Sequence, residues 1–157
     1  MKSSFEIVEQ PDLQVAYIEH VGPYDQIGQA FPRLMAWAGP RGVFEDPGAL
    51  VLGVYLDDPE ATPADQLRSR ACVTVPPGTT GEGDVGTMTL PGGLFAVGHF
   101  EIDPSEYGAA WSEVYHYIPQ SGHVPDERMC YEVYLNDPAT HPEGRHVVDI
   151  YEPVRPA

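Results

Sequence analysis

The chain contains an internal repeat, and this feature constrains its fold more than any other. Residues 54–59 read VYLDDP, and residues 133–138 read VYLNDP. The match extends to Pro63 and Pro142, and six of these ten aligned positions are identical. Such self-similarity is the signature of a structural unit that occurs twice in one chain. We therefore expect two similar halves, with function in a pseudo-twofold cleft between them.

The repeat covers most of the chain. Phe31 aligns with Trp111, an offset of 80, and after one deletion Val54 aligns with Val133, an offset of 79. We place the first copy at about 3–76, a linker at about 77–84 and the second copy at about 85–155. Because 157 residues make one ordinary domain and half of them would be marginally stable alone, we predict a single domain with a shared core.

Each copy is predicted to be a ββαββ unit. Alternating apolar residues indicate strands, and apolar residues at i, i+4, i+7, i+8 and i+11, counted from Ile27 and again from Tyr107, indicate one helix in each copy. The first two strands of each copy read as a hairpin around the turns 10–12 and 91–93. We therefore predict an α+β fold of about eight mainly antiparallel strands and two principal helices around a central cleft. The expected strands are 5–9, 14–20, 50–56, 68–75, 86–90, 94–100, 129–135 and 147–151.

The two helices have different start signals. Asp103, Pro104 and Glu106 form a variant of the capping box ahead of the second helix. Pro32 lies inside the periodic segment of the first helix, which predicts a late start or a kink there. Trp37 lies beyond the apolar stripe of that helix, so we expect it at the margin of the core.

The charge of the chain is strongly acidic. Twenty-four Asp and Glu residues against eight Lys and Arg residues give a formal net charge of -16. Such a field repels phosphate backbones, so we expect no nucleic-acid partner. The same field attracts cations, although an acidic coat that serves solubility is the alternative interpretation.

Cys72 and Cys130 lie within predicted strands, and we expect both to be buried free thiols in a reducing compartment. No apolar run has the length of a signal peptide or a membrane span. We therefore expect a cytoplasmic protein without a membrane partner.

Common catalytic and metal-binding signatures are absent from the sequence. The six histidines show neither HxH nor HxxxH spacing, and no nucleophile elbow, phosphate-binding loop or dinucleotide fingerprint occurs. We therefore expect no metal and no cofactor. The paired polar residues at 57–58 and 136–137 follow strands and end in proline, so we interpret them as turn formers.

The strongest candidate for chemistry is Glu132, an acid within the apolar segment 129–135. Because side chains alternate in a strand, Glu132 and Tyr134 share one face. The aligned residue of the first copy is Gly53, with Tyr55 beside it. If these strands face each other, a carboxylate and two tyrosines surround a space that suits a flat organic cation. The alternative is an edge-strand glutamate that points at water.

Phe31 and Trp111 occupy equivalent positions on the apolar faces of the two helices. Their spacing predicts core residues, and we expect some residues of these faces to line the cleft as well.

Several segments together resemble a known family, the GyrI-like small-molecule-binding domain, also called the AraC-type effector-binding domain. The family is related to the DNA gyrase inhibitory protein and to the ligand domains of multidrug-responsive regulators. The resemblance covers nearly the whole chain. It is carried by residues 21–24, 53–59, 71–75, 91–93, 110–111, 132–138 and 149–151.

The resemblance implies two pseudo-symmetric βαββ modules around a central cleft, with a glutamate that pairs with lipophilic cations. That glutamate falls on Glu132. Arg70 departs from the family, where aspartate is frequent, and a basic group near the rim would weaken a preference for cations. Many relatives carry a DNA-binding helix-turn-helix ahead of this domain, whereas this chain begins at a strand. We therefore expect a stand-alone binding protein and not a complete transcription factor.

Three functions compete. The first is a non-enzymatic protein that binds hydrophobic aromatic, cationic small molecules for sensing or sequestration. The second is a hydrolase of electrophilic cyclopropane-containing drugs, in which Glu132 orients or deprotonates water while Tyr55 or Tyr134 stabilises a developing phenolate. The third is a protein-binding module with gyrase as its partner. The predicted ligand-binding residues are Glu132, Tyr134, Tyr55, Trp111, Gly53 and Phe31.

Overall fold

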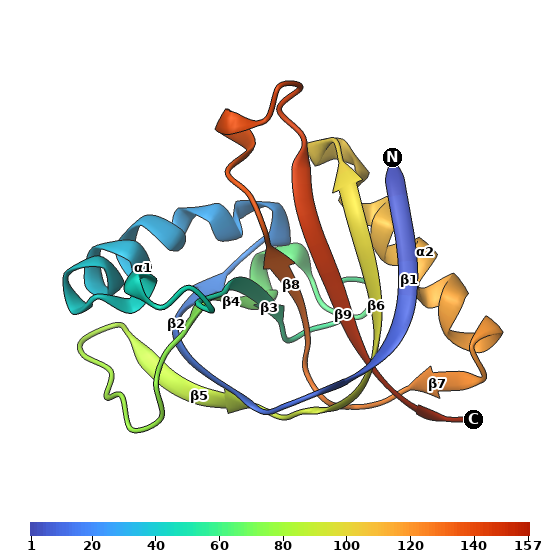
Figure 1. The fold of residues 1–157 in the computed structure, drawn as a ribbon, viewed down its shortest axis with the longest axis horizontal. Coiled ribbons are helices and arrows are strands. Elements are labelled where there is room, and N and C mark those ends of the chain that lie inside the picture. The colour runs from blue at the N-terminus through green and yellow to red at the C-terminus, as the bar shows by residue number, and fades with distance from the viewer. The chain divides into compact units, whose positions relative to one another are not determined.

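The computed structural model describes residues 1–157 and consists of antiparallel strands and two α-helices, which confirms the predicted α+β class (Figure 1). The chain divides into two compact units. Unit 1 comprises residues 1–11 and 91–157, and unit 2 comprises residues 12–90. Neither helix has the length and hydropathy needed to span a membrane.

Unit 2 is a four-stranded antiparallel sheet with one α-helix. Its strand order is β3-β4-β2-β5, and α1 packs against β2 and β4. Short 3-10 turns precede and follow this helix. The core lies between α1 and the sheet and is formed by small and branched side chains together with Leu34 and Trp37. The elements are β2 (Leu13–Val21), α1 (Phe31–Ala38), β3 (Val51–Tyr55), β4 (Arg68–Thr74) and β5 (Gly86–Leu90).

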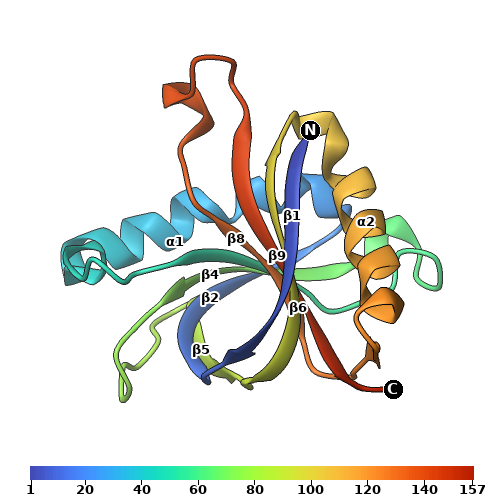
Figure 2. The ribbon, with the colours of Figure 1, turned by 45° about the vertical axis from the view of Figure 1, so that its right-hand side comes forward.

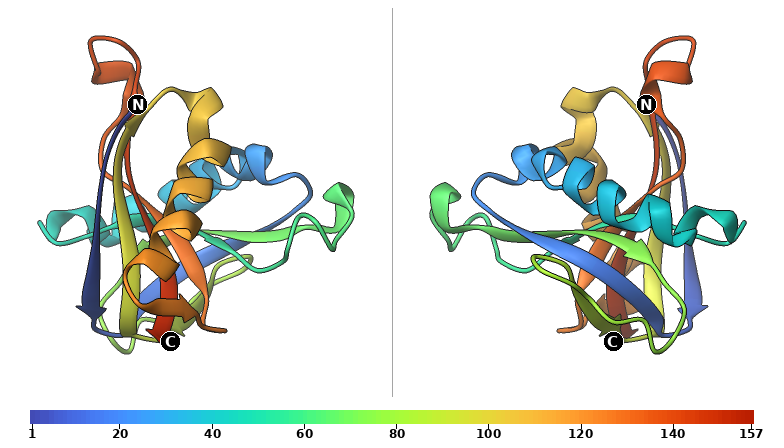
Figure 3. Two further views of the ribbon diagram at one scale, coloured as in Figure 1. Left: turned by 90° about the vertical axis from the view of Figure 1, so that its right-hand side faces the viewer. Right: turned by 90° about the vertical axis from the view of Figure 1, so that its left-hand side faces the viewer.

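Unit 1 repeats this plan with one additional strand. Its order is β1-β6-β9-β8, and the short β7 pairs with the end of β9. Figures 2 and 3 show α2 running across the strands of this unit, where it contacts β6, β7 and β9. The elements are β1 (Lys2–Gln10), β6 (Gly93–Ile102), α2 (Tyr107–Gln120), β7 (His123–Pro125), β8 (Cys130–Tyr134) and β9 (His146–Pro156).

The two predicted hairpins are wrong, because the first strand of each copy pairs with a strand of the other copy. In unit 1, β1 pairs with β6, with Ile7 opposite Ala96. In unit 2, β5 pairs with β2, with Thr87 opposite Ala16. In the repeat, Ile7 aligns with Thr87 and Ala16 aligns with Ala96. The two pairings are therefore equivalent: in each of them the first strand of one copy pairs with the second strand of the other copy. The turn residues correctly predict where each strand ends, but they carry no information about the strand with which it pairs.

The remaining strand registers are consistent with the duplication. Gly53 lies opposite Ala71 in the β3–β4 pair, and Glu132 lies opposite Ile150 in the β8–β9 pair. The repeat relates both members of the first pair to both members of the second. The two copies therefore present equivalent sheet faces.

The second residue of each polar pair forms a turn, as predicted: Asp58 accepts a hydrogen bond from the backbone N–H of Glu60 at 2.9 Å, and Asp137 accepts one from the backbone N–H of Ala139 at 2.9 Å. Asp57 accepts a hydrogen bond from the backbone N–H of Arg68 at 2.8 Å, and Asn136 accepts one from the backbone N–H of Val147 at 2.8 Å. These two hydrogen bonds join equivalent positions of the two copies. The Asp57 side chain thus links the ends of β3 and β4, and the Asn136 side chain links the ends of β8 and β9. Both side chains have a structural role.

The helix starts also follow the sequence. Asp103 accepts a hydrogen bond from the backbone N–H of Ser105 at 3.1 Å, and Glu106 accepts one from the backbone N–H of Asp103 at 2.7 Å. This capping box precedes a 3-10 turn that leads into α2. In the first copy, α1 begins only at Phe31, immediately before Pro32, so the predicted late start is confirmed.

Two further features of the fold differ from the sequence-based expectations. Trp37, expected at the margin, is only 8% exposed and belongs to the core of unit 2. The strand expected to end at residue 151 continues to Pro156, where its extension pairs with β7. β7 has only three residues and contains a proline, so its sequence carries no alternation to detect.

Candidate functional site

The carboxylate of Glu132 is held by two aromatic side chains within unit 1. Glu132 is 4% exposed. The indole Nε1 of Trp111 donates to its Oε2 at 2.6 Å, and the hydroxyl of Tyr134 donates to its Oε1 at 2.8 Å. The structure thus brings three of the predicted site residues together. Both donors are uncharged, so these hydrogen bonds stabilise the carboxylate without neutralising it.

The alternation of β8 places Glu132 beneath α2. Tyr131 and Val133 are buried on one face, and Glu132 and Tyr134 lie on the other. The helix can approach this second face closely because β6 carries Gly98 there. A Cβ at Gly98 would lie 2.9 Å from the side chain of Val114, on α2, and would also collide with the ring of Phe100. This close approach lets Trp111 reach the sheet.

Tyr107, which the sequence places on the apolar face of the second helix, lies near Glu132 but is absent from the predicted ligand-binding residues. It lies one turn before Trp111 on α2, and its hydroxyl hydrogen-bonds with Nδ1 of His146 at 2.5 Å. Burial, and then the nearby charge of Glu132, raise the pKa of the Tyr107 phenol above its ordinary value. Its position on the apolar stripe of α2 is the available signal, but such a stripe predicts core residues.

Glu152 is a second acid that the sequence patterns did not single out. It lies on β9 and is 6% exposed. Burial raises the pKa of its carboxyl group to about 7, and hydrogen bonds with Tyr115 and Cys130 oppose this rise. The strand predicted from the sequence ends at Tyr151, so the prediction did not include Glu152, the next residue, in the sheet.

The other predicted site residues belong to unit 2. Gly53 is buried on β3, opposite Ala71. The half-buried ring of Tyr55 packs edge-on against Tyr24, with ring centroids 4.7 Å apart. Phe31 begins α1 and packs against the core of unit 2. The predicted cleft that combines these three residues with Glu132 stays a prediction.

Arg70, which is expected near the rim of the cleft, lies on β4. It neighbours Ala71 on β4, so its side chain points away from the face of Gly53 and Tyr55. Its guanidinium pairs with Glu19 at 3.2 Å and lies over the ring of Tyr17, 4.2 Å from the centroid.

Neither cysteine forms a disulfide; Cys72 is buried as expected, whereas Cys130 is only half-buried. Burial raises the pKa of Cys72 far above its ordinary value. Burial, followed by the charge of Glu152, raises the pKa of Cys130 to about 12. Neither thiol is therefore a nucleophile at neutral pH.

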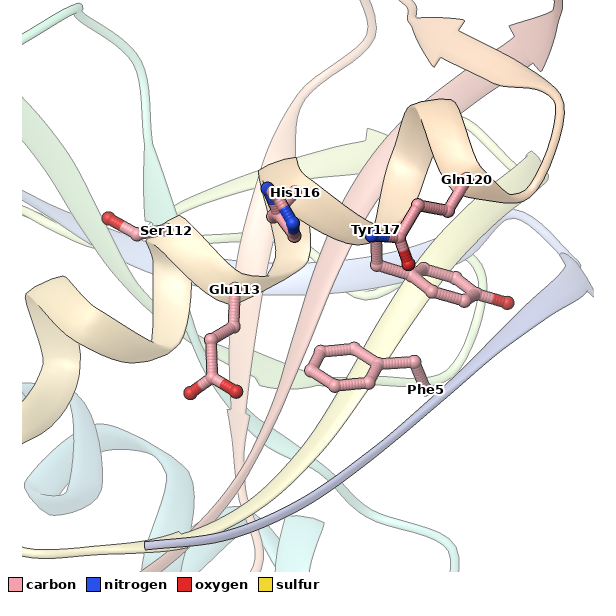
Figure 4. Close-up of a pocket in the computed structure, with 6 residues that line it drawn as sticks. All are labelled: Phe5, Ser112, Glu113, His116, Tyr117 and Gln120. Carbon is pink, nitrogen blue, oxygen red and sulfur yellow. The ribbon is translucent and has the colours of Figure 1, made fainter.

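The surface of unit 1 has a hollow of about 370 Å³ between α2 and β1 (Figure 4). Phe5 and Tyr117 stack at its base, with ring centroids 5.2 Å apart. Ser112, Glu113, His116 and Gln120 complete its lining. No predicted ligand-binding residue takes part, so this hollow is distinct from the Glu132 site.

Comparison with known proteins places this fold and sequence in one family. The model of the GyrI-like small molecule binding domain matches residues 3–155. DNA gyrase inhibitor 2 of Dickeya dadantii (strain 3937) is 37% identical over 150 residues, which cover 93% of this chain and 92% of that protein.

Two solved structures show the same fold. The C-terminal domain of EcmrR has a TM-score of 0.72 at 13% identity, covering 99% of this chain and 98% of that chain. SAV2435, solved bound to tetraphenylphosphonium, has a TM-score of 0.56 at 18% identity, covering 97% of this chain and 94% of that chain. At such identities the likeness establishes the fold alone. The family match and the gyrase-inhibitor relative establish more: this chain belongs to the GyrI-like small molecule binding domain family.

Proposed function

We propose that this protein binds hydrophobic aromatic small molecules that carry a positive charge, with Glu132 as the anionic anchor. The observation that carries this proposal is a carboxylate, 4% exposed, that is oriented by an indole and a phenol. Family membership supports a small-molecule ligand. The charge of the ligand is inferred from the carboxylate.

A buried carboxylate favours a cationic guest for a simple physical reason. Removal from water destabilises the charged form of the carboxyl group, and an opposite charge within about 4–6 Å stabilises that form again. The aromatic faces of Trp111 and Tyr134 each add about 0.5–2 kcal/mol of cation–π attraction. The formal net charge of -16 raises the local concentration of cations.

The structural neighbour SAV2435 provides a probe. Its structure was solved bound to tetraphenylphosphonium, an aromatic ion with one positive charge. This compound matches the ligand class inferred from Glu132. Three further contacts with the ligand stay predictions, namely those of Gly53, Tyr55 and Phe31. Substitution of each residue measures its contribution to the binding affinity.

The test is a calorimetric titration with tetraphenylphosphonium and with the neutral triphenylphosphine oxide. Wild type should bind the cation more tightly, and Glu132→Gln should weaken cation binding about 10- to 100-fold, since the substitution removes the Coulombic attraction between the carboxylate and the cation, which is about 1.4–2.8 kcal/mol at that fold-change. Glu127→Gln, at an exposed position, controls for the change in net charge. Equal binding of the cation by Glu132→Gln and wild type would overturn the proposal.

The hydrolase alternative draws on one contact. The hydroxyl of Tyr134 donates to Glu132 at 2.8 Å, and a carboxylate paired with a phenol can orient water and stabilise a developing oxyanion. Mass spectrometry of the titrated compounds separates the two functions. Unchanged compounds support binding, and product formation that disappears in Glu132→Gln supports hydrolysis.

The gyrase alternative draws on the relative named DNA gyrase inhibitor 2. An acidic surface that replaces DNA phosphates would bind gyrase in a salt-dependent manner. Capture of purified gyrase at low salt, and its release at high salt, would support this function. Absence of capture at every salt concentration would exclude it.

A further inference from the structure

Glu152 and Glu132 lie on the same face of the sheet in unit 1. Glu132 is opposite Ile150 in the β8–β9 register, so Glu152 is its diagonal neighbour two positions further along β9. Diagonal neighbours lie about 7–8 Å apart, and their Cβ atoms are somewhat closer. Both residues are buried, at 4% and 6% exposure. Two acids therefore lie within the reach of one small ligand.

One oxygen of Glu152 is unsatisfied. Its Oε2 is buried and has no hydrogen-bond partner, although Tyr115 and Cys130 hydrogen-bond to the carboxyl group. A buried polar atom without a partner costs about 1–3 kcal/mol, so such atoms are rare in folded proteins. This oxygen is therefore available to pair with a ligand.

The two acids have parallel environments. Trp111 and Tyr115 lie one helical turn apart on α2, with ring centroids 6.2 Å apart. Trp111 hydrogen-bonds with Glu132 and Tyr115 with Glu152. One helix face thus supplies an aromatic donor to each acid.

We propose that Glu152 is a second anionic residue of the ligand site, which thereby takes aromatic ligands with two positive charges. This inference rests on the proposed function of Glu132 and defines its ligand class more narrowly. Glu132 pairs with one charge, and Oε2 of Glu152 pairs with the other.

The negative charge of Glu152 depends on pH. The titratable groups that face Glu152 are Tyr115 from α2 together with Cys130 and Glu132 from β8, whereas β6 contributes Ala96 and Gly98. Tyr115 and Cys130 are neutral at pH 7, and Glu152 itself is partly protonated there because burial raises its pKa to about 7. A dication binds the ionised form, so the proton of Glu152 passes to the buffer.

The experiment compares benzyltrimethylammonium with 1,4-bis(trimethylammoniomethyl)benzene, whose charges are independent of pH. At pH 8 wild type should bind the dication about tenfold more tightly than the monocation, and this preference should grow about tenfold between pH 6 and pH 8. Glu152→Gln should bring the two affinities within about twofold of each other. Glu127→Gln should retain the preference.

Proton release provides a second readout that needs no variant. Calorimetry at pH 7 in two buffers of different ionisation enthalpy should show that wild type releases about half a proton on binding the dication. A purely structural Glu152 would release none.

Two failures are distinguishable. If tetraphenylphosphonium does not bind wild type, the proposed function fails and this inference fails with it. If tetraphenylphosphonium binds, but the dication shows neither a preference nor proton release, this inference alone is overturned and Glu152 is a protonated structural acid.

Discussion

The two copies of the repeat carry different chemistry on equivalent sheet faces. Gly53 and Val73 of the first copy correspond to Glu132 and Glu152 of the second. Val73 is fully buried in an apolar core, whereas the two glutamates are buried acids. The two units therefore share an arrangement of strands and helix, but only unit 1 carries acids at these two positions.

The helices show the same division. Phe31 and Met35 of α1 pack against an apolar core. Their counterparts in the second copy, Trp111 and Tyr115, each hydrogen-bond with one of the acids. Each acid of the second copy is thus accompanied by its own donor. This is expected if a buried carboxylate is retained only where polar partners lower its cost.

The largest expected effect comes from moving an acid into the first copy. Val73→Glu puts a carboxyl group opposite Val51 and Ala16, which offer no hydrogen bond. We expect the free energy of unfolding at pH 8 to fall by roughly 3–5 kcal/mol. Chemical denaturation measures this, with Val73→Ala as the control for lost packing. A loss no greater than that of Val73→Ala would mean that the two faces are equally tolerant of charge.

The next effect is the pH dependence of stability caused by Glu152. Its folded-state pKa of about 7 lies above the ordinary value of 4.5, so the folded state binds the proton more tightly. Stability from this group is complete below pH 4.5 and is lost as the pH rises to about 7, by roughly 3 kcal/mol. Glu152→Gln should therefore lose less stability than wild type between pH 4.5 and pH 8 in denaturation experiments. Parallel pH profiles would contradict a protonated Glu152.

A smaller effect tests the indole donor. Trp111→Phe gives the second copy an aromatic ring of the kind found at Phe31 and removes the 2.6 Å hydrogen bond to Glu132. We expect about tenfold weaker binding of tetraphenylphosphonium, which corresponds to about 1.4 kcal/mol. Calorimetry gives the affinity, and Phe31→Leu shows the effect of a packing change in the other copy. Unchanged affinity in Trp111→Phe would remove the indole from the site.

The smallest effect concerns the opposite sheet face. His99 pairs with Asp149 at 2.8 Å, and the equivalent positions of the first copy hold Glu19 and Arg70, a pair of reversed polarity. Burial lowers the pKa of His99, but hydrogen bonds with Glu6 and Asp149 raise it more, so the net shift is upward.

The stabilisation from His99 is therefore present at low pH and is lost as the pH rises through the raised folded-state value. His99→Gln should destabilise by at most about 1 kcal/mol at pH 5 and by less at pH 9, because the imidazole is partly exposed and solvent screens its charge. Arg70→Gln should cost a similar amount at both pH values. Denaturation of both variants at the two pH values tests the contrast, which a pH-independent effect of His99→Gln would contradict.

Much of this comparison could be predicted from the sequence, because the repeat and the alternation of side chains are local patterns. The alignment of the two copies relates Glu132 to Gly53, and the period of two puts Glu132 and Tyr134 on one face. The capping residue Asp103 and the late helix start at Pro32 follow from backbone chemistry.

The rest depends on contacts between distant segments. The exchange of β1 and β5 could not be predicted, since Ile7 fits the apolar face of β2 or of β6 equally well. The pairing of Trp111 with Glu132 requires the close approach of α2 at Gly98, which no sequence pattern reveals. The burial of Glu152 could not be predicted either, because it depends on β9 continuing beyond Tyr151.

The two tryptophans allow the central claim, ligand recognition by the acidic face of the second copy, to be tested directly. Trp111 hydrogen-bonds with Glu132, whereas Nε1 of Trp37 is buried in unit 2 without a hydrogen-bond partner. Each indole N–H gives its own cross-peak in a ¹⁵N–¹H correlation spectrum, so tetraphenylphosphonium can be titrated against both at once. We predict a saturable shift of the Trp111 peak, absent in Glu132→Gln, with little change at Trp37. A saturable shift at Trp37 with an unchanged Trp111 peak would contradict the account.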